Sequence, residues 1–502
     1  MRKLVIKALI VMIMITYSGV SAFAIPYPAY SYEKQTVRAL KAPAALVPET
    51  IISTEVYGIG RMTDPADVFS DAKGRVYLLD SGNGRVICLD PSLEKLLFVV
   101  TGSDINNSPG FTFKGAQGLF VNETHIYIAD TNRGRILKHP IPGVESGSNT
   151  GSVIIRPSKM LFDVNKTPFN PTKIVVDRMG RMFVVANGVF EGLLEMSAEG
   201  EFLSYVGANK VSVSVIDYFR RMFSTRKQWE AMAKLVPVEF SNVFLDSDDF
   251  IYTTAKGQTG EAGIRRLNLN GANILRARPD QFFGDFYGYT VPVNRIKEPF
   301  FTDVVAGPDE TFAGLDKTSG RVFVYDSDCN MIFQFGGLGL EKGTFVSPNS
   351  IVWLPDNRIG VLDIRNADFT VFRTTEYGDL ILSAVDHEFN GEYEEAAEAY
   401  KQILVMNANS ELPYIGFGKQ LYRQGKYKES MPYFKLGNDR IYYSKAYENH
   451  RKDILGILIP AVILVIIAVA LIFGLLSLVR SIRRAKTRIA GIRQMYGIED
   501  KR

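Results

Sequence analysis

A hairpin motif with fixed spacing recurs along this chain of 502 residues. An apolar strand ends in Asp, a polar turn follows, and Gly and Arg stand four and five positions after the Asp. The motif occurs at Asp80–Val86, Asp130–Ile136 and Asp316–Val322. Because a constant spacing around a turn marks a repeated supersecondary unit, we expect an array of similar β-units. The recurrence also indicates that the Asp caps a turn and is not catalytic.

Six versions of the unit align on their first strands, at Val68, Leu119, Ile174, Val243, Val304 and Ile351. Steps of roughly 40 to 50 residues with four strands each are typical of a β-propeller, and longer steps need insertions. Unbroken apolar runs such as Val76–Leu79 fit sheets that are covered on both faces. The sequence therefore predicts a mainly β fold, a six-bladed β-propeller over residues 46–386. We expect Ile51–Tyr57 to close the ring by pairing with the last blade, since closure removes exposed sheet edges.

Two segments, 208–237 and 276–299, break the period. The first has helical spacing over Ser214–Leu235, and the second is rich in Phe and Tyr. Because both follow neighbouring blades, they can lie together over one face. They form a lid over a ligand or pack against the rim of the ring, and both interpretations stay open.

The strand and turn at Ile126–Ile136, IYIADTNRGRI, resemble the NHL repeat. This resemblance covers residues 46–386 and implies a six-bladed NHL propeller. The first, second and fifth units match well. The sixth keeps Asp363 but has Ala367 and Asp368 where the others have Gly and Arg, and the third lacks the Asp. These departures affect where one blade ends and the next begins more than they affect the expected propeller fold.

Both ends of the chain are hydrophobic. Residues 1–24 combine a basic start, a short apolar run and Ala22-Phe23-Ala24, as a secretory signal peptide does. Residues 454–479 carry no charge and would form about 39 Å of helix, enough to cross a membrane. The tail 480–502 is rich in Arg and Lys, which marks the cytoplasmic side. We expect a single-pass protein of the cell membrane with its N-terminal domains outside and its C-terminus in the cytoplasm.

The basic tail has two interpretations. It holds the topology and contacts anionic lipid, or it forms a docking surface for a cytoplasmic protein. Away from the two ends the chain is mildly acidic, so no nucleic-acid partner is expected. The cysteines, Cys88 and Cys329, are too few for a disulfide framework or a zinc site and are expected to lie apart.

Between the propeller and the apolar span, similar segments stand 34 residues apart, at Asn390–Tyr393 and Gln424–Tyr427. They are similar to the tetratricopeptide repeat, which implies paired helices over residues 387–450. Such helices either bind a protein partner or act as a stiff spacer, and both interpretations stay open. The candidate partner contacts are Tyr414, Phe417 and Tyr422.

Propellers bind and react at the mouth of their central channel. By alignment, the polar residues at this mouth are Asp67, Gln117, Lys173, Asn242, Asp303 and Asn349. Six-bladed relatives of the gluconolactonase and senescence-marker family hold a divalent metal on the axis. The resemblance implies Asp67, Asn242 and Asp303 as oxygen ligands, although a lysine in the same ring would repel a cation. We assign no catalytic residue, metal or cofactor, because no hydrolase, zinc-protease or phosphate-loop motif is present.

These features predict a membrane-anchored extracytoplasmic binding or scaffold protein. Its propeller would engage a ligand or partner, and its helical repeats would dock a membrane-associated protein complex. The layout resembles that of bacterial proteins associated with solute uptake or envelope systems. The alternative is a metal-assisted envelope hydrolase or lyase of the gluconolactonase kind, acting at the channel mouth.

Overall fold

The computed structural model describes residues 25–33, 38–108, 110–144, 151–157, 168–207, 239–255, 263–277, 283–285 and 299–495. The predicted signal peptide, the helical insertion at 208–237 and most of the insertion at 276–299 lie outside these residues, as do residues 496–502 of the basic tail. The chain divides into two compact units, Met1–Ser410 and Glu411–Arg502.

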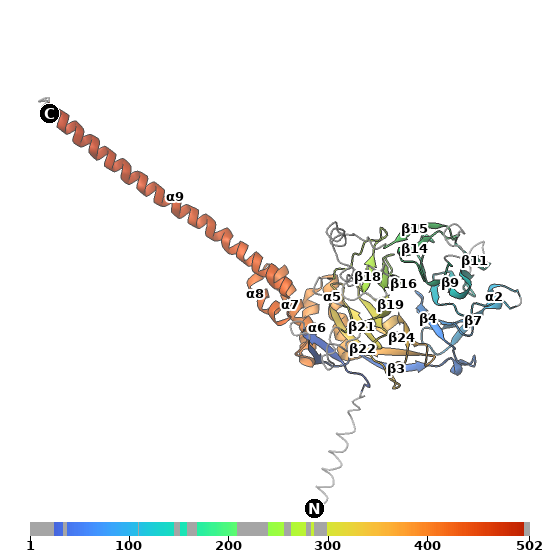
Figure 1. Cartoon of the computed structure of the whole chain (residues 1–502). Coiled ribbons are helices and arrows are strands. Elements are labelled where there is room, and N and C mark those ends of the chain that lie inside the picture. The colour runs from blue at the N-terminus through green and yellow to red at the C-terminus, as the bar shows by residue number, and fades with distance from the viewer. Residues whose placement is uncertain are drawn as a thin grey trace, which may run out of the picture. The chain divides into compact units, whose positions relative to one another are not determined.

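The first unit contains a six-bladed β-propeller of antiparallel sheets (Figure 1). Blade one comprises β4 (Pro65–Ser70), β5 (Val76–Asp80), β6 (Arg85–Leu89) and β7 (Leu96–Thr101). Blade two comprises β8 (Gly118–Val121), β9 (His125–Asp130), β10 (Arg135–Pro140) and β11 (Val153–Ile155). Blade three comprises β12 (Pro171–Val176), β13 (Met182–Ala186), β14 (Leu193–Met196) and β15 (Phe202–Val206).

The other three blades complete the ring. In its described part, blade four comprises β16 (Phe240–Leu245), β17 (Ile251–Ala255) and β18 (Ile264–Leu267). Blade five comprises β19 (Phe301–Ala306), β20 (Phe312–Asp316), β21 (Arg321–Tyr325) and β22 (Met331–Gly336). Blade six comprises β23 (Pro348–Trp353), β24 (Ile359–Asp363), β25 (Asp368–Thr374) and β3 (Leu46–Ile52). The first strands contact one another in the order β4, β8, β12, β16, β19, β23 and back to β4.

An N-terminal strand closes the ring, as expected, although it lies earlier in the chain than predicted. β3 pairs with β25, with Ile51 opposite Thr370. Residues Thr54–Tyr57, which the sequence placed in the closing strand, form a short 3-10 helix. Blade six therefore combines three strands from the end of the propeller with one from its start, and this pairing covers the outer edge of β25.

The recurrent Asp has the structural role that its repetition indicated. The carboxylate of Asp80 accepts hydrogen bonds from the backbone N–H of Thr63 (2.8 Å) and from Nε of Arg85 (2.6 Å). In blade five, Asp316 accepts from the backbone N–H of Phe300 at 2.8 Å. Each carboxylate therefore ties the end of a second strand to the segment that leads into the first strand of the same blade.

Part of the aromatic insertion packs against blade five. Phe283 is only 2% exposed, and its ring lies 5.1 Å from that of Tyr325 and 6.0 Å from that of Phe312. The backbone N–H of Gly284 donates to the Tyr325 hydroxyl at 2.7 Å. These contacts favour packing on the ring for residues 283–285.

The chain before β3 also belongs to the propeller unit. A hairpin of β1 (Tyr30–Glu33) and β2 (Arg38–Lys41) precedes it. The buried Tyr27 donates from its hydroxyl to the carbonyl of Leu46 at 2.9 Å, and Gln334 donates to the carbonyl of Pro28 at 2.8 Å. The ordered unit thus begins before residue 46.

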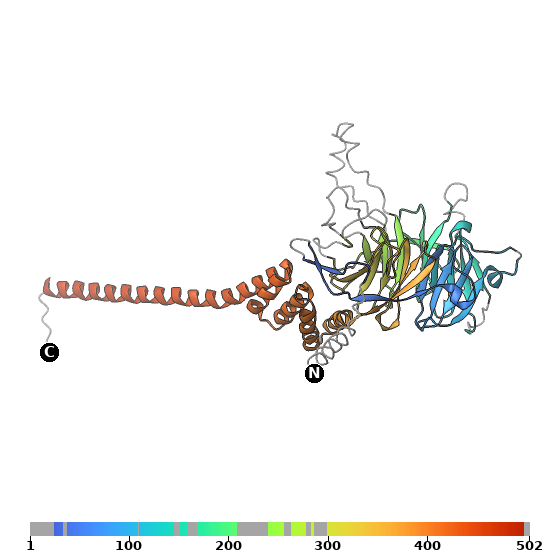
Figure 2. The same cartoon turned by 90° about the horizontal axis from the view of Figure 1, so that it is seen from below.

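Helices follow β25 directly (Figure 2). In the first unit these are α5 (Glu376–Asn390) and α6 (Tyr393–Met406), so the helical region starts before the predicted residue 387. The Thr375 hydroxyl caps α5 by accepting from the N–H of Gly378, and it donates to the carbonyl of Ala44 at 2.6 Å. Gly391 ends α5 with a φ of 83°, which a glycine adopts without strain.

The second unit holds α7 (Glu411–Arg423), α8 (Tyr427–Leu436) and α9 (Arg440–Met495). Helix α9 contains the apolar stretch 454–479, whose side chains are exposed, and it is long and apolar enough to cross a membrane. Short helices complete the described structure: η1 (Thr54–Tyr57), α2 (Gly102–Ile105), η2 (Thr131–Arg133) and η5 (Pro355–Asn357).

Candidate functional site

The first strand of every blade places one residue at the same register position around the axis. In blade one this residue is Asp67, which pairs with Leu79, the residue just before the recurrent Asp80. In the other blades the axial residue pairs with the residue at the corresponding position of the second strand. The six axial residues are Asp67, Gly118, Lys173, Asn242, Asp303 and Ser350. In five of the six strands, all but β8, a β-bulge directly precedes the axial residue. Such bulges re-aim a side chain, and here they turn polar side chains toward one another.

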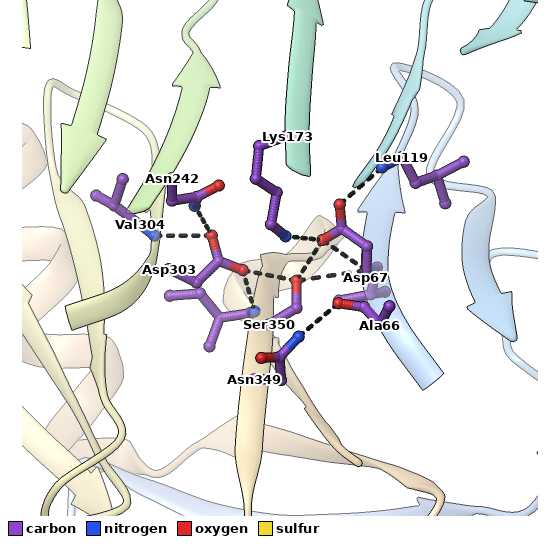
Figure 3. A network of polar contacts seen from close by, with 11 residues as sticks. Ala66, Asp67, Leu119, Lys173, Asn242, Asp303, Val304, Asn349 and Ser350 are labelled. Carbon is purple, nitrogen blue, oxygen red and sulfur yellow. Dashed lines mark hydrogen bonds and ion pairs between the residues drawn. The ribbon is translucent and has the colours of Figure 1, made fainter. Parts of the chain in front are cut away.

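Lys173 of blade three and Asp67 of blade one form a buried ion pair (Figure 3). The Lys173 Nζ lies 2.5 Å from Oδ1 of Asp67. The Asp67 carboxylate also accepts from the backbone N–H of Leu119 at 2.8 Å and of Val68 at 3.1 Å. Together with Lys173, these donors satisfy both side-chain oxygens of Asp67.

Asp303 of blade five is the second carboxyl group of the network. It accepts from the backbone N–H of Val304 at 2.8 Å and of Ile351 at 2.7 Å, and from the Asn242 side-chain amide. The Ser350 hydroxyl connects the two acids (Figure 3), because its Oγ lies 2.6 Å from Oδ2 of Asp303 and 2.8 Å from Oδ1 of Asp67. All five polar axial residues are buried.

Burial changes how these groups hold protons. Burial raises the pKa of Asp303 to about 6, opposed by the Lys173 ammonium and reinforced by Asp67. Burial by itself lowers the pKa of Lys173, but the carboxyl groups of Asp67 and Asp303 outweigh it and raise that pKa above its ordinary value. Lys173 is therefore charged at neutral pH.

The hydrogen-bond geometry accommodates a proton on Asp303 when the pH falls below about 6. A hydroxyl carries a single hydrogen, so Ser350 can donate to one of its two carboxyl neighbours. When Asp303 carries a proton on Oδ2, it donates to Ser350, and Ser350 donates to the Asp67 carboxylate. Each of the two short O–O contacts then has its own hydrogen.

The space left on the axis is small. Next to the polar network lies a cavity of about 70 Å³. Farther along the first strands its wall includes Phe69, Phe120, Phe244 and Trp353. Sites for metabolite-sized ligands usually enclose about 300–1,000 Å³, so this cavity accommodates a few water molecules and not a substrate of that size.

The structure brings together four of the six residues predicted for the channel mouth: Asp67, Lys173, Asn242 and Asp303. Gln117 is exposed and stands one position before the axial Gly118. Asn349 also stands one position too early, and its side chain donates to the carbonyl of Ala66 at 2.5 Å. Ser350 takes the axial place in blade six.

A sequence signal for the two missed residues was present. The axial residue in each blade directly precedes the apolar position on which the six first strands align, such as Val68 or Ile351. Applying this offset uniformly selects Gly118 and Ser350. Glycine fits at residue 118 because a Cβ there would lie 2.6 Å from the carbonyl oxygen of Thr172 and 2.8 Å from Cα of Lys173.

The axial residues do not fit a divalent cation in this arrangement. The Lys173 ammonium lies against Asp67, where a cation would bind, and Asn242 presents its amide N–H to Asp303. Within the described residues no cluster of three or more His, Cys, Asp or Glu side chains has the geometry of a metal site. The expected oxygen ligands are instead bonded to one another and to backbone N–H groups.

The three predicted partner contacts lie on α7. Tyr422 belongs to an aromatic cluster between α7, α8 and α9, with ring centroids 5.2 Å from Tyr427 and 6.0 Å from Tyr442. Its hydroxyl accepts from the Asn449 side chain at 2.7 Å, so this tyrosine holds the three helices together. Tyr414 and Phe417 are half-buried and keep part of their surface exposed.

Neither a protein-family model nor a curated protein sequence matches this chain. Among solved structures, a streptogramin B lyase is 11% identical, with a TM-score of 0.40 over 67% of this chain and 100% of that chain. A virginiamycin B lyase from Staphylococcus aureus is 10% identical, with a TM-score of 0.38 over 62% of this chain and 96% of that chain. The β-propeller domain of Cps50 (Swd1) from Myceliophteria thermophila is 12% identical, with a TM-score of 0.39 over 66% of this chain and 100% of that domain. Similarity at this level does not bear on function.

Proposed function

We propose that this chain is a membrane-anchored, extracytoplasmic binding or scaffold protein of a bacterial envelope. An NHL-type propeller follows a cleaved signal peptide, and tetratricopeptide-like helices connect it to a single membrane span, α9. The propeller engages a ligand or partner outside the cell. The helices dock a membrane-associated protein complex, such as a transport or envelope system.

The internal bonding of the axial residues carries this proposal. An enzyme that worked at the channel mouth would present unpaired polar groups to a substrate. Here Lys173 pairs with Asp67, and the side chains of Asp67 and Asp303 both contact the Ser350 hydroxyl. The small cavity beside them has no room for a lactone-sized molecule. Binding therefore uses the rim and outer surfaces of the blades.

The topology rests on the charge pattern around α9. The 26 residues 454–479 lack charge, and six Arg or Lys residues follow within residues 480–495. Basic residues next to a span stay in the cytoplasm, so the propeller lies outside. Arg480, Arg483 and Arg484, which are nearest to the span, contact anionic lipid headgroups.

Cysteine labelling in intact cells tests the topology. Both native cysteines are buried, so the background labelling by a membrane-impermeant maleimide is low. We expect Lys73→Cys, in an exposed turn of blade one, to be labelled and Lys486→Cys to react only after the membrane is permeabilised. The opposite pattern contradicts the proposed orientation.

Photo-crosslinking in native membranes tests the scaffold function. A crosslinking residue at Phe417 or Tyr414 is expected to join the full-length chain to a membrane-associated protein. The matched control is Lys428, an exposed position on α8. Equal adducts at all three positions, or none at any, contradict docking through α7. Lactone turnover that is lost in Asp303→Ala would favour the hydrolase instead.

A further inference from the structure

Helix α9 does not end where its apolar stretch ends. It continues without interruption from Val479 to Met495, a further length of about 24 Å. Residues 480–495 contain no acidic side chain. Their basic side chains are Arg480, Arg483, Arg484, Lys486, Arg488 and Arg493.

Apolar residues line one face of this extension. Ile482, Ala485, Ile489 and Ile492 follow one another at steps of three and four, which places them on a single side of a helix. We name these four residues the cytoplasmic stripe. Ile482, Ile489 and Ile492 are 48%, 55% and 54% exposed, and Ala446 is the buried residue of α9 in the described chain. Three isoleucines exposed on one face of a helix are typical of a surface that packs against another helix.

The charges beside the stripe argue against a second copy of this chain. With Ile482 and Ile489 at the a positions of a heptad, Lys486 and Arg493 take e positions and Arg488 takes a g position. In a parallel pair, Arg488 of one helix would face Arg493 of the other. This repulsion selects a partner whose flanking residues are acidic.

The helix geometry argues against the bilayer as the occupant. Ile489 lies ten residues beyond Val479, about 15 Å along a helix that leaves the membrane. To lay the stripe on the headgroups, the helix would have to bend sharply, and such kinks occur at Pro, at Gly or at a bulge. Residues 480–490 contain neither Pro nor Gly, and α9 is continuous there.

We propose that the cytoplasmic stripe docks an acidic amphipathic helix of a partner protein. The partner helix carries apolar residues at its a and d positions and Glu or Asp at the flanking e and g positions. Arg488, Lys486 and Arg493 pair with these acids, while the isoleucines pack into the apolar seam. This inference rests on the proposed function, because the proposed topology places residues 480–495 in the cytoplasm. The partner helix must therefore be cytoplasmic.

The test uses the full-length chain in phosphatidylcholine nanodiscs, which lack anionic lipid. The probe is a fluorescent three-heptad peptide with Leu at a and d and Glu at e and g; a second peptide has Lys at e and g. We expect the Glu peptide to bind and the Lys peptide to bind at least about tenfold more weakly. The triple variant Lys486→Glu/Arg488→Glu/Arg493→Glu should reverse this preference.

Two double variants test whether the cytoplasmic stripe, and not another face of the helix, binds the Glu peptide. Ile482→Ser/Ile489→Ser should weaken binding of the Glu peptide about tenfold or more. Thr487→Ser/Gln494→Ser, on the opposite face, should leave the affinity unchanged. Equal binding of both peptides, or equal affinities of the two double variants, overturns the inference.

Crosslinking in native membranes identifies the molecule that contacts the cytoplasmic stripe. A photo-crosslinking residue at Ile489 should give an adduct with a protein whose crosslinked segment is an acidic amphipathic helix. Adducts with lipid, or with a second copy of this chain, overturn the inference. Failure of the proposed function is recognised separately, by maleimide labelling at Lys73→Cys and crosslinking at Phe417, which do not involve the stripe.

Discussion

The Nζ atom of Lys173 lies 2.5 Å from Oδ1 of Asp67 on the propeller axis, although the two residues belong to blades three and one. Blade two lies between them in the ring and contributes Gly118 at its axial position. The absence of a side chain at Gly118 allows the strand that carries Lys173 to approach closely. One ion pair thus bridges two blades that are not neighbours.

Lys173→Met is expected to destabilise the propeller by about 3–5 kcal/mol, because it leaves the buried Asp67 carboxylate without its counter-charge. Thermal or denaturant unfolding of the full chain in detergent measures this loss. The double variant Asp67→Asn/Lys173→Met removes both charges and should recover much of the stability. If the single and double variants unfold alike, the ion pair does not have the assigned role.

Asp303 should make stability depend on pH. Its pKa is raised by burial to about 6 in the folded chain, so the folded state binds a proton more tightly than the unfolded state. The free energy of unfolding therefore falls as pH rises from about 4 to about 6, by about 3 kcal/mol from this group, and then levels off. Asp303→Asn should remove this slope in denaturant titrations across that range. A slope that the variant leaves unchanged contradicts the assignment.

Asp368→Arg is expected to stabilise the closing blade. Asp368 pairs in register with Asp363, where blades one and two pair Arg85 with Asp80 and Arg135 with Asp130. Burial raises the pKa of Asp368 to about 6, and the nearby Asp363 carboxylate raises it further while Arg61 opposes both.

An arginine at residue 368 restores the ion pair of the other blades and should increase stability by about 0.5–2 kcal/mol at neutral pH. Asp368→Asn serves as the control, because it removes the repulsion without supplying a partner. Melting temperatures at neutral pH should rank the arginine variant above the asparagine variant. Equal values would show that the added cation does not reach Asp363.

Gly118→Ala is expected to cost about 1–3 kcal/mol, because the new methyl group meets the Thr172 carbonyl and the Lys173 backbone. Gly151→Ala is the matched control, since no atom lies within 4 Å of a Cβ at that position. Denaturant unfolding compares the two. Equal stabilities would mean that blade three shifts freely, against the tight packing inferred at the axis.

The blades could be predicted from the amino-acid sequence alone, since strands, turns and their spacing are local properties. The Asp80, Asp130 and Asp316 motifs predicted the six-bladed propeller, and the uncharged stretch 454–479 predicted the apolar helix. The sequence also indicated four of the residues that the structure brings together on the axis, because polar residues at the start of inner strands are conspicuous among apolar runs.

Which side chains meet on the axis depends on long-range contacts that the sequence pattern does not reveal. A β-bulge before the axial residue shifts the register by one position, and a shift of one turns a strand residue to the opposite face. For this reason Ser350, and not Asn349, joins Asp303 to Asp67. Likewise, the sequence suggested that Lys173 would repel a metal ion, whereas the folded ring gives it Asp67 as a partner from a strand 106 residues away.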